Sequence, residues 1–176
     1  GVNLFLGFEL EIDLANNVLY LNKLNENNEC LSHSALSRCK QPDMQIDVHL
    51  RRDVISFQAL LNGKKLRLGF DTGAEYNILS NDISTKALDG VRIIRKMQLY
   101  GSSGGSSEVL AGSTDILEIA GFRIANMQTI VADFSAMRQA YGNNLDGLVG
   151  YPLLSRGIIC LNFQSKQMRF YTNVKS

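Results

Sequence analysis

Short apolar runs separated by turn residues dominate this sequence and constrain its fold more than any other feature. Their length and alternation predict strands, which fall at 44–49, 54–61, 65–70, 92–100, 113–119, 122–131, 158–163 and 167–171. Two short helices are also predicted, from 81 to 88 with Ser80 as cap, and from 135 to 141 with Asp133 or Ser135 as cap. Neither helix is long enough to form a layer. The sequence therefore predicts an all-β fold with two or three short helices.

The sharpest turn signal is Asn62-Gly63, between the runs 54–61 and 65–70. Both residues tolerate positive φ, which a two-residue hairpin turn requires. The second run leads directly into Asp71-Thr72-Gly73. The sequence therefore predicts a hairpin whose second strand delivers an aspartate onto a tight loop.

Size and charge narrow the classes of protein. The chain has 176 residues, 45% of them hydrophobic, which is enough for one good core but not for two full-sized domains. Lys and Arg total 18 against 17 for Asp and Glu, and no long run of like charge occurs, so we expect no nucleic-acid partner. No apolar run approaches the roughly 20 residues that a membrane-spanning helix needs, so we expect no membrane span.

An internal repeat joins the two ends of the sequence. Residues 1–21 align without a gap on residues 150–170, and both copies run as glycine, short apolar turn, strand, polar turn and strand. The alternative is that any two hairpins resemble each other because all hairpins alternate. The repeat predicts that 1–21 is the tail of a preceding homologous lobe, 22–41 a polar connector, and 42–176 the lobe itself.

The three cysteines leave the redox state open. Cys30 and Cys39 lie nine positions apart in a polar stretch and form either a disulfide, which indicates an oxidising compartment, or two free thiols in a loop. Together with His33 they offer three zinc ligands where a structural site has four, so we expect no metal. Cys160, with an apolar neighbour on each side, is predicted to be a small buried hydrophobe.

Asp-Thr-Gly alone is a weak signal, because average residue usage places a given tripeptide in roughly a few per cent of chains of this length. On its own, Asp71 suits a turn aspartate that bonds its own backbone before Gly73. The strand before it and the later run Leu148-Val149-Gly150 favour catalysis instead. Asp146 is either a turn residue or a residue near a substrate channel, and the turn is favoured.

The stretch from about 44 to 171 resembles the retropepsin-like aspartic proteases. In that family Asp-Thr-Gly is followed downstream by two apolar residues and a glycine that lead into a short helix. Asp71-Thr72-Gly73 and Leu148-Val149-Gly150 match these elements in order. The resemblance implies a closed, β-barrel-like lobe in which the second element, Leu148, Val149 and Gly150, packs under the catalytic loop.

The resemblance also implies roles for the loop. Asp71 is the catalytic acid/base, Thr72 ties two such loops together through its hydroxyl, and Gly73 turns the backbone and offers its N–H to the carboxylate. No metal or cofactor is implied. The substrate is a polypeptide, hydrolysed by a water that two aspartates activate.

A flap over the substrate is the looser part of the resemblance. A Gly/Ser-rich run begins at Tyr100 and contains Gly101, Gly104 and Gly105, where a flap tip is expected. The alternative is an ordinary flexible loop. A phosphate-binding loop is excluded because the run lacks the Gly-Lys-Ser/Thr ending.

One lobe supplies one aspartate, so the second comes from another copy of the chain or from a tandem lobe. The leading hypothesis is therefore an aspartic endopeptidase lobe that acts in a pair. The alternative is an inactive, protease-like module for peptide binding or assembly. The compartment stays open, with export in a bacterium favoured by a Cys30–Cys39 bridge and by resemblance to the longer bacterial members.

Overall fold

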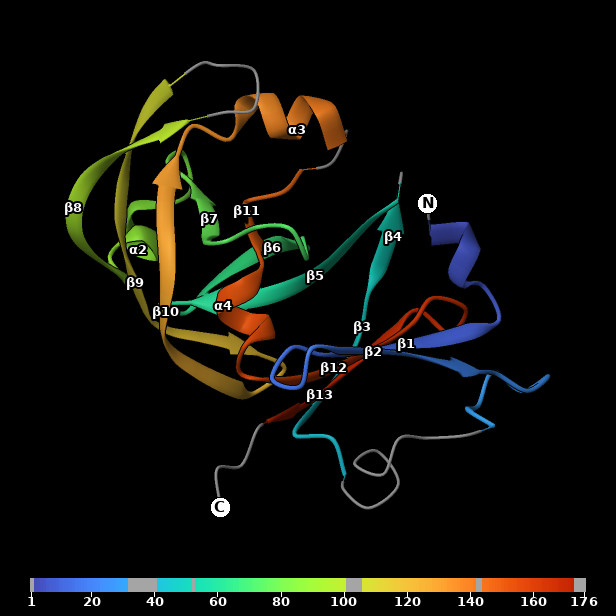
Figure 1. Cartoon of the computed structure of the whole chain (residues 1–176). Helices are drawn as coiled ribbons and strands as arrows, with labels where there is room; N and C mark the ends of the chain where they lie inside the picture. The colour runs from blue at the N-terminus through green and yellow to red at the C-terminus, as the bar shows by residue number, and fades with distance from the viewer. Residues whose placement is uncertain (1, 32–40, 52, 101–105, 142–143, 173–176) are drawn as a thin grey trace. The chain divides into compact units, whose positions relative to one another are not determined.

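The computed structural model describes residues 2–31, 41–51, 53–100, 106–141 and 144–172. The chain divides into two compact units, which we describe separately (Figure 1). The first unit comprises Gly1–Phe57 and Leu153–Ser176, and the second comprises Gln58–Pro152. In the described part of the chain, none of the helices has the length and apolar character needed to cross a membrane.

The first unit is built on an antiparallel five-stranded sheet in the order β2-β1-β12-β13-β3. Its elements are η1 (Val2–Phe5), β1 (Phe8–Asp13), β2 (Val18–Lys23), β3 (Met44–Asp47), β12 (Gly157–Asn162) and β13 (Gln167–Thr172). Two hairpins, β1–β2 and β12–β13, therefore lie side by side through β1 and β12. Strand β4 (His49–Arg51) pairs with the start of β5.

The second unit contains a curved sheet that closes on itself. Its strands run in the order β5-β6-β11-β7-β10-β9-β8, and a further pairing of β5 with β9 joins the two sides into a partly closed ring. The elements are β5 (Val54–Leu61) from Gln58 on, β6 (Lys64–Phe70), β7 (Asn77–Ser80), α2 (Thr85–Leu88), β8 (Val91–Tyr100), β9 (Ser106–Ile119), β10 (Phe122–Ala132), α3 (Ser135–Tyr141), β11 (Gly147–Val149) and α4 (Tyr151–Leu154) up to Pro152. The prediction of an all-β fold with short helices is confirmed.

The turn between β5 and β6 has the predicted chemistry. Asn62 has φ 48° and Gly63 has φ 73°, as a two-residue hairpin turn with positive φ at both positions requires. The local sequence therefore specifies this hairpin, and Asp71 directly follows its second strand, β6.

The first predicted helix is shorter than expected. Helix α2 begins at Thr85, and Ser84 is its cap, accepting a hydrogen bond from the Ala87 N–H. Ser80 as cap was wrong: it ends β7, and its hydroxyl donates to Asp82. The second helix matches its predicted bounds, since α3 begins at Ser135, whose N–H donates to Asp133 Oδ1.

The ring of the second unit holds one buried hydroxyl without a partner. Among the described residues, Thr114 Oγ1 on β9 is the buried side-chain oxygen that has no hydrogen bond. Thr129 on β10 is equally buried, but its hydroxyl donates to the Met127 carbonyl at 2.9 Å. A buried polar group without a partner keeps its full desolvation cost.

Thr114→Val should therefore stabilise the protein, by about 1 kcal/mol, because it removes an unsatisfied hydroxyl with little change of shape. Thr129→Val is the matched control and should lower the free energy of unfolding, because it removes a hydrogen bond that is made. Denaturant unfolding of both variants measures the difference. Equal destabilisation by the two substitutions would contradict the assignment.

Candidate active site

The loop after β6 holds its aspartate through its own backbone. The Gly73 N–H donates to Asp71 Oδ1 at 2.9 Å, and the Ala74 N–H donates to the Asp71 carbonyl at 3.3 Å. Asp71 is partly exposed, while Thr72 and Gly73 are exposed. One oxygen of the carboxylate is thus bonded to the backbone of its own loop, while the side chain stays partly exposed.

Strand β11 lies between the two strands that flank this loop. It pairs parallel with β6, with Val149 opposite Phe70, and antiparallel with β7, with Leu148 opposite Ile78. Leu148 and Val149 are each 1% exposed. The Asp71 N–H donates to the Val149 carbonyl at 2.9 Å, so the run predicted to pack under the loop directly anchors its first residue.

Gly150 makes the closest approach to the loop. A Cβ at this position would lie 2.3 Å from the Ala74 carbonyl oxygen and 2.9 Å from the Asp71 carbonyl oxygen. Contacts below 3.0 Å with backbone atoms have no room to relax. Only glycine therefore lets the chain pass under the aspartate loop here, after which the Tyr151 N–H donates to the Ala74 carbonyl at 2.9 Å.

Asn77 is a site residue that the sequence did not reveal. It is 2% exposed, and its Oδ1 accepts the Gly150 N–H at 3.1 Å. Its Nδ2 lies 3.7 Å from the Met127 sulfur. The side chain thus joins β7 to the end of β11. An asparagine six positions after an aspartate carries no motif, so only the strand pairing identifies it.

Asp146 has a structural role, as the turn interpretation expects. Its carboxylate accepts the Arg67 N–H at 2.7 Å, and its own N–H donates to the Arg67 carbonyl at 2.8 Å. Its carbonyl accepts the Ser80 N–H at 2.8 Å. Asp146 therefore joins β6 to β7 just before β11 begins.

An ion pair connects α3 to the same region. The Arg138 guanidinium binds Asp82 through two nitrogens, one at 2.8 Å from Oδ1, and its Nε donates to the Leu145 carbonyl at 2.7 Å. The hydrogen bonds from Arg138, and then from Ser80, hold the pKa of Asp82 well below its usual range. Arg138 thus ties the helix to the start of the β11 segment.

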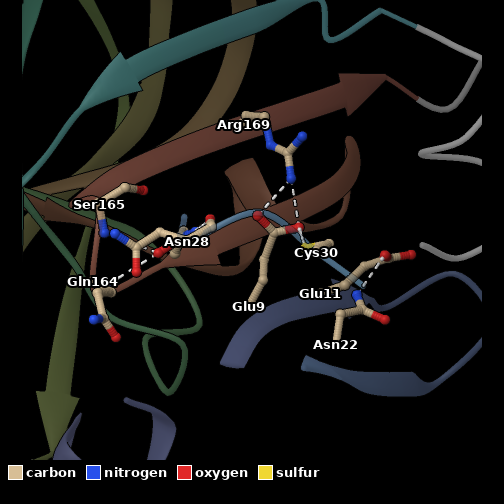
Figure 2. A network of polar contacts seen from close by, with 9 residues as sticks. Glu9, Glu11, Asn22, Asn28, Cys30, Gln164, Ser165 and Arg169 are labelled. Atoms are coloured by element: carbon tan, nitrogen blue, oxygen red, sulfur yellow. Dashed lines mark hydrogen bonds and ion pairs between the residues drawn. The ribbon is translucent and has the colours of Figure 1, made fainter. Parts of the chain in front are cut away.

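Cys30 lies in a polar network of the first unit (Figure 2). The Cys30 thiol donates to Glu9 Oε1 at 3.1 Å, and Arg169 forms an ion pair with the same carboxylate. Burial, together with the Glu9 hydrogen bond, raises the pKa of Cys30 to about 12, and burial raises the pKa of Cys160. Neither thiol is a nucleophile near neutral pH.

The predicted disulfide is not formed by a described pair. Cys30 is a free cysteine, and Cys39 lies outside the described residues, so the bridge stays a prediction. Cys160 is free and 1% exposed, which confirms it as a buried hydrophobe.

Of the flap candidates, Gly101, Gly104 and Gly105 also lie outside the described residues. The strands that flank them are described: β8 and β9 pair up to Tyr100 opposite Ser106. A long hairpin therefore leads up to the predicted flap tip.

Asn77→Ala should loosen the junction of β7 and β11, because it leaves the buried Gly150 N–H without its acceptor. We expect a loss of about 1–3 kcal/mol in the free energy of unfolding. Asn81→Ala, at an exposed position just after β7, is the control and should stay within about 0.5 kcal/mol of the parent. Equal stability of both variants in denaturant unfolding would rule out the role given to Asn77.

Asp82→Asn should weaken the tie to α3 by about 0.2–1 kcal/mol near neutral pH, since the Asp82 side chain is 57% exposed. The pKa of Asp82 is lower in the folded state, so its contribution is complete above about pH 4 and shrinks as the pH falls further. The difference from the parent should therefore close in acid. Asp115→Asn, at an exposed position on β9, is the control, and a gap that widened in acid would contradict the sign.

Comparisons with known proteins agree with this geometry. The chain is similar to a retropepsin-like aspartic protease from Rickettsia conorii, at 18% identity and a TM-score of 0.50, over 72% of this chain and 89% of that one. At this identity the likeness shows the fold alone. No curated protein matches the chain. A family model described as aspartyl protease matches residues 57–153, the second unit to within one residue at each end. Because this match covers more than half of the 176 residues of the chain, the chain belongs to the aspartyl protease family.

Proposed function

We propose that the chain is an aspartic endopeptidase lobe in which Asp71 is the catalytic acid/base. The observation that carries the proposal is the way Asp71 is held. Its carboxylate accepts the Gly73 N–H, its backbone is anchored to Val149, and Gly150 passes directly beneath the loop. A turn aspartate needs only the first of these contacts. The other two fix the loop against a separate strand, as a catalytic group requires.

The chemistry explains why the lobe works in a pair. Hydrolysis of a peptide without a metal or a covalent intermediate needs a water to be deprotonated and a carbonyl oxygen to receive a proton. Two facing carboxylates share one proton because like charges about 3 Å apart cannot both ionise. One then acts as base toward water while the other donates to the carbonyl. Thr72 is exposed beside Asp71, which supports the proposal that its hydroxyl contacts a second loop.

The hairpin of β8 and β9 is the proposed flap, with Tyr100, Gly101, Gly104 and Gly105 around its tip. Its support is that the two strands stay paired up to the glycine-rich run. Closing over a bound peptide would exclude bulk water from the carboxylates, which strengthens electrostatic interactions inside the site. The substrate class is a polypeptide, and no cofactor is needed.

Asp71→Asn should abolish cleavage of a diverse peptide pool between about pH 3 and pH 8, because the amide cannot serve as acid or base. Asp89→Asn, at an exposed position at the end of α2, is the matched control and should retain the activity. Chelators should have no effect. Both variants are measured in the chain alone and in the polypeptide extended by the residues that precede Gly1.

The outcomes separate the functional classes. Activity in the chain alone means that two copies form the dyad, and activity in the extended form alone means that a preceding lobe completes it. Cleavage that survives Asp71→Asn, or the absence of cleavage in both forms, would favour the inactive peptide-binding or assembly module. The sequence contains a single Asp-Thr-Gly, which keeps that alternative open to this test.

A further inference from the structure

The sheet of the first unit is two copies of one motif. Elements η1, β1 and β2 recur as α4, β12 and β13 with identical lengths and a constant offset of 149 residues, as from Phe8 to Gly157 and from Val18 to Gln167. The turns match as well. Asn17 has φ 54° and its counterpart Lys166 has φ 55°. The repeat seen in the sequence is therefore a repeat of structure.

Side chains at the turns also repeat. Asp13 Oδ1 accepts the Asn16 N–H at 3.1 Å, and its counterpart Asn162 Oδ1 accepts the Ser165 N–H at 2.9 Å. In both copies the last residue of the first strand closes the turn three positions later. Two unrelated hairpins have no reason to share this contact, the strand lengths and the turn conformation together.

The two copies pair as a symmetric dimer would. Glu9 lies opposite Asn162, and Asp13 lies opposite Ile158. With the offset of 149, Asn162 corresponds to Asp13 and Ile158 to Glu9, so exchanging the copies leaves the register unchanged. A self-complementary contact of this kind is the property of a two-fold axis. Strand β1 thus occupies the edge of β12 that a second copy of the hairpin would otherwise use.

The symmetry breaks at the outer edges of the sheet. The outer edge of strand β13 pairs with β3, with Met168 opposite Ile46 and Phe170 opposite Met44. Strand β2 ends the sheet on the other side. The Leu31 N–H donates to the Lys23 carbonyl at the end of this strand at 2.8 Å, and none of the described strands pairs with β2 on its outer edge. Among the described residues, the first copy therefore lacks the strand neighbour that the second copy has.

The two copies also differ in burial on the side of the sheet that ends at β2. Leu4, Leu19 and Leu21 are 78%, 58% and 51% exposed. Their counterparts Leu153, Met168 and Phe170 are each 0% exposed. Leucines spaced by two on a strand lie on one face, and that face continues across the sheet as Leu10, Ile12, Ile159 and Leu161, all buried. The uncovered part, Leu4, Leu19 and Leu21, is the apolar edge.

The opposite face of the sheet is already satisfied by internal contacts. Glu9 binds Arg169, and Asn22 Nδ2 donates to Glu11 at 3.4 Å (Figure 2). Glu9, Glu11 and Asn22 are all at least nine-tenths buried. A partner is therefore needed on the apolar edge and not on the polar face.

We propose that a homologous lobe preceding this chain in the same polypeptide covers the apolar edge and pairs a strand with the outer edge of β2. Residues 1–24 are then the closing hairpin of that lobe. The inference rests on the proposed need for a second lobe and names which one it is. A second copy of the chain is disfavoured because β1 fills the edge of β12 that an exchange of equivalent hairpins would require.

Hydrogen exchange tests the proposal on unmodified protein. In the chain alone, the amides at the outer edge of β2 should exchange as those of an exposed strand. In the polypeptide extended by the preceding residues, those amides should exchange at least about tenfold more slowly. The amides of β13 are the internal control and should not change. Unchanged exchange of β2 in the extended form would overturn the proposal. Protection of β2 in the chain alone that grows with its concentration would overturn it in favour of a second copy.

A charge substitution adds a second readout. Leu19→Lys with Leu21→Lys should abolish the β2 protection in the extended form while leaving the fold of the chain alone intact, because both positions are exposed there. The matched control is Ile93→Lys with Ile94→Lys, at two exposed positions of β8, and should leave the protection unchanged. Equal loss of protection in both double variants would count against the apolar edge as the docking surface.

These measurements do not depend on activity. Protection of β2 without peptide cleavage would support the docked lobe and contradict the proposed function. Cleavage that depends on Asp71 while β2 stays unprotected would support the function and contradict the docked lobe.

Discussion

The hydrogen bond from the Asp71 N–H to the Val149 carbonyl, with Gly150 passing beneath, is the contact on which the site depends. It joins a loop at the end of β6 to a strand that arrives about 80 residues later. Parallel pairing of β11 with β6 and antiparallel pairing with β7 bring that strand between the two sides of the loop. The backbone of Asp71 is therefore tied to the centre of the sheet.

Supporting contacts surround this junction at each end. Asp146 joins β6 to β7, Asn77 holds the Gly150 N–H, and Arg138 ties α3 to Leu145 and Asp82. Each uses a polar side chain to link two segments that lie apart in the sequence. The proposed catalytic role of Asp71 requires a group held close to a productive geometry, and these contacts support that proposal.

Much of the fold could be predicted from local sequence. Asn62-Gly63 predicts its own turn, and strands such as Val54–Leu61 show their length by alternation and flanking turns. The motif predicts a glycine at position 150. The physical reason for it, that a Cβ there would clash with the carbonyl oxygens of Ala74 and Asp71, is visible only in the structure. Strand β11 has three residues, too few to show the alternation of a strand although Leu148 and Val149 belong to a motif, and Asn77 belongs to no motif. The helix at 81–88 was predicted too long because serine is a good helix cap, whereas pairing of β7 with β10 and β11 keeps Ser80 in a strand.

The repeat was visible in the sequence. The two-fold register of its two copies and their unequal burial were not visible, because both arise from pairing between distant segments.

The central claim is that Asp71 is one half of a pair of carboxylates completed by another lobe. A crystal structure of the polypeptide extended by the residues before Gly1 tests it most directly. The account predicts a second aspartate from the preceding lobe, with its carboxylate about 3 Å from that of Asp71 and a strand paired with β2. An Asp71 carboxylate with no second carboxylate within hydrogen-bond distance, in a structure where the preceding residues are folded, would contradict it.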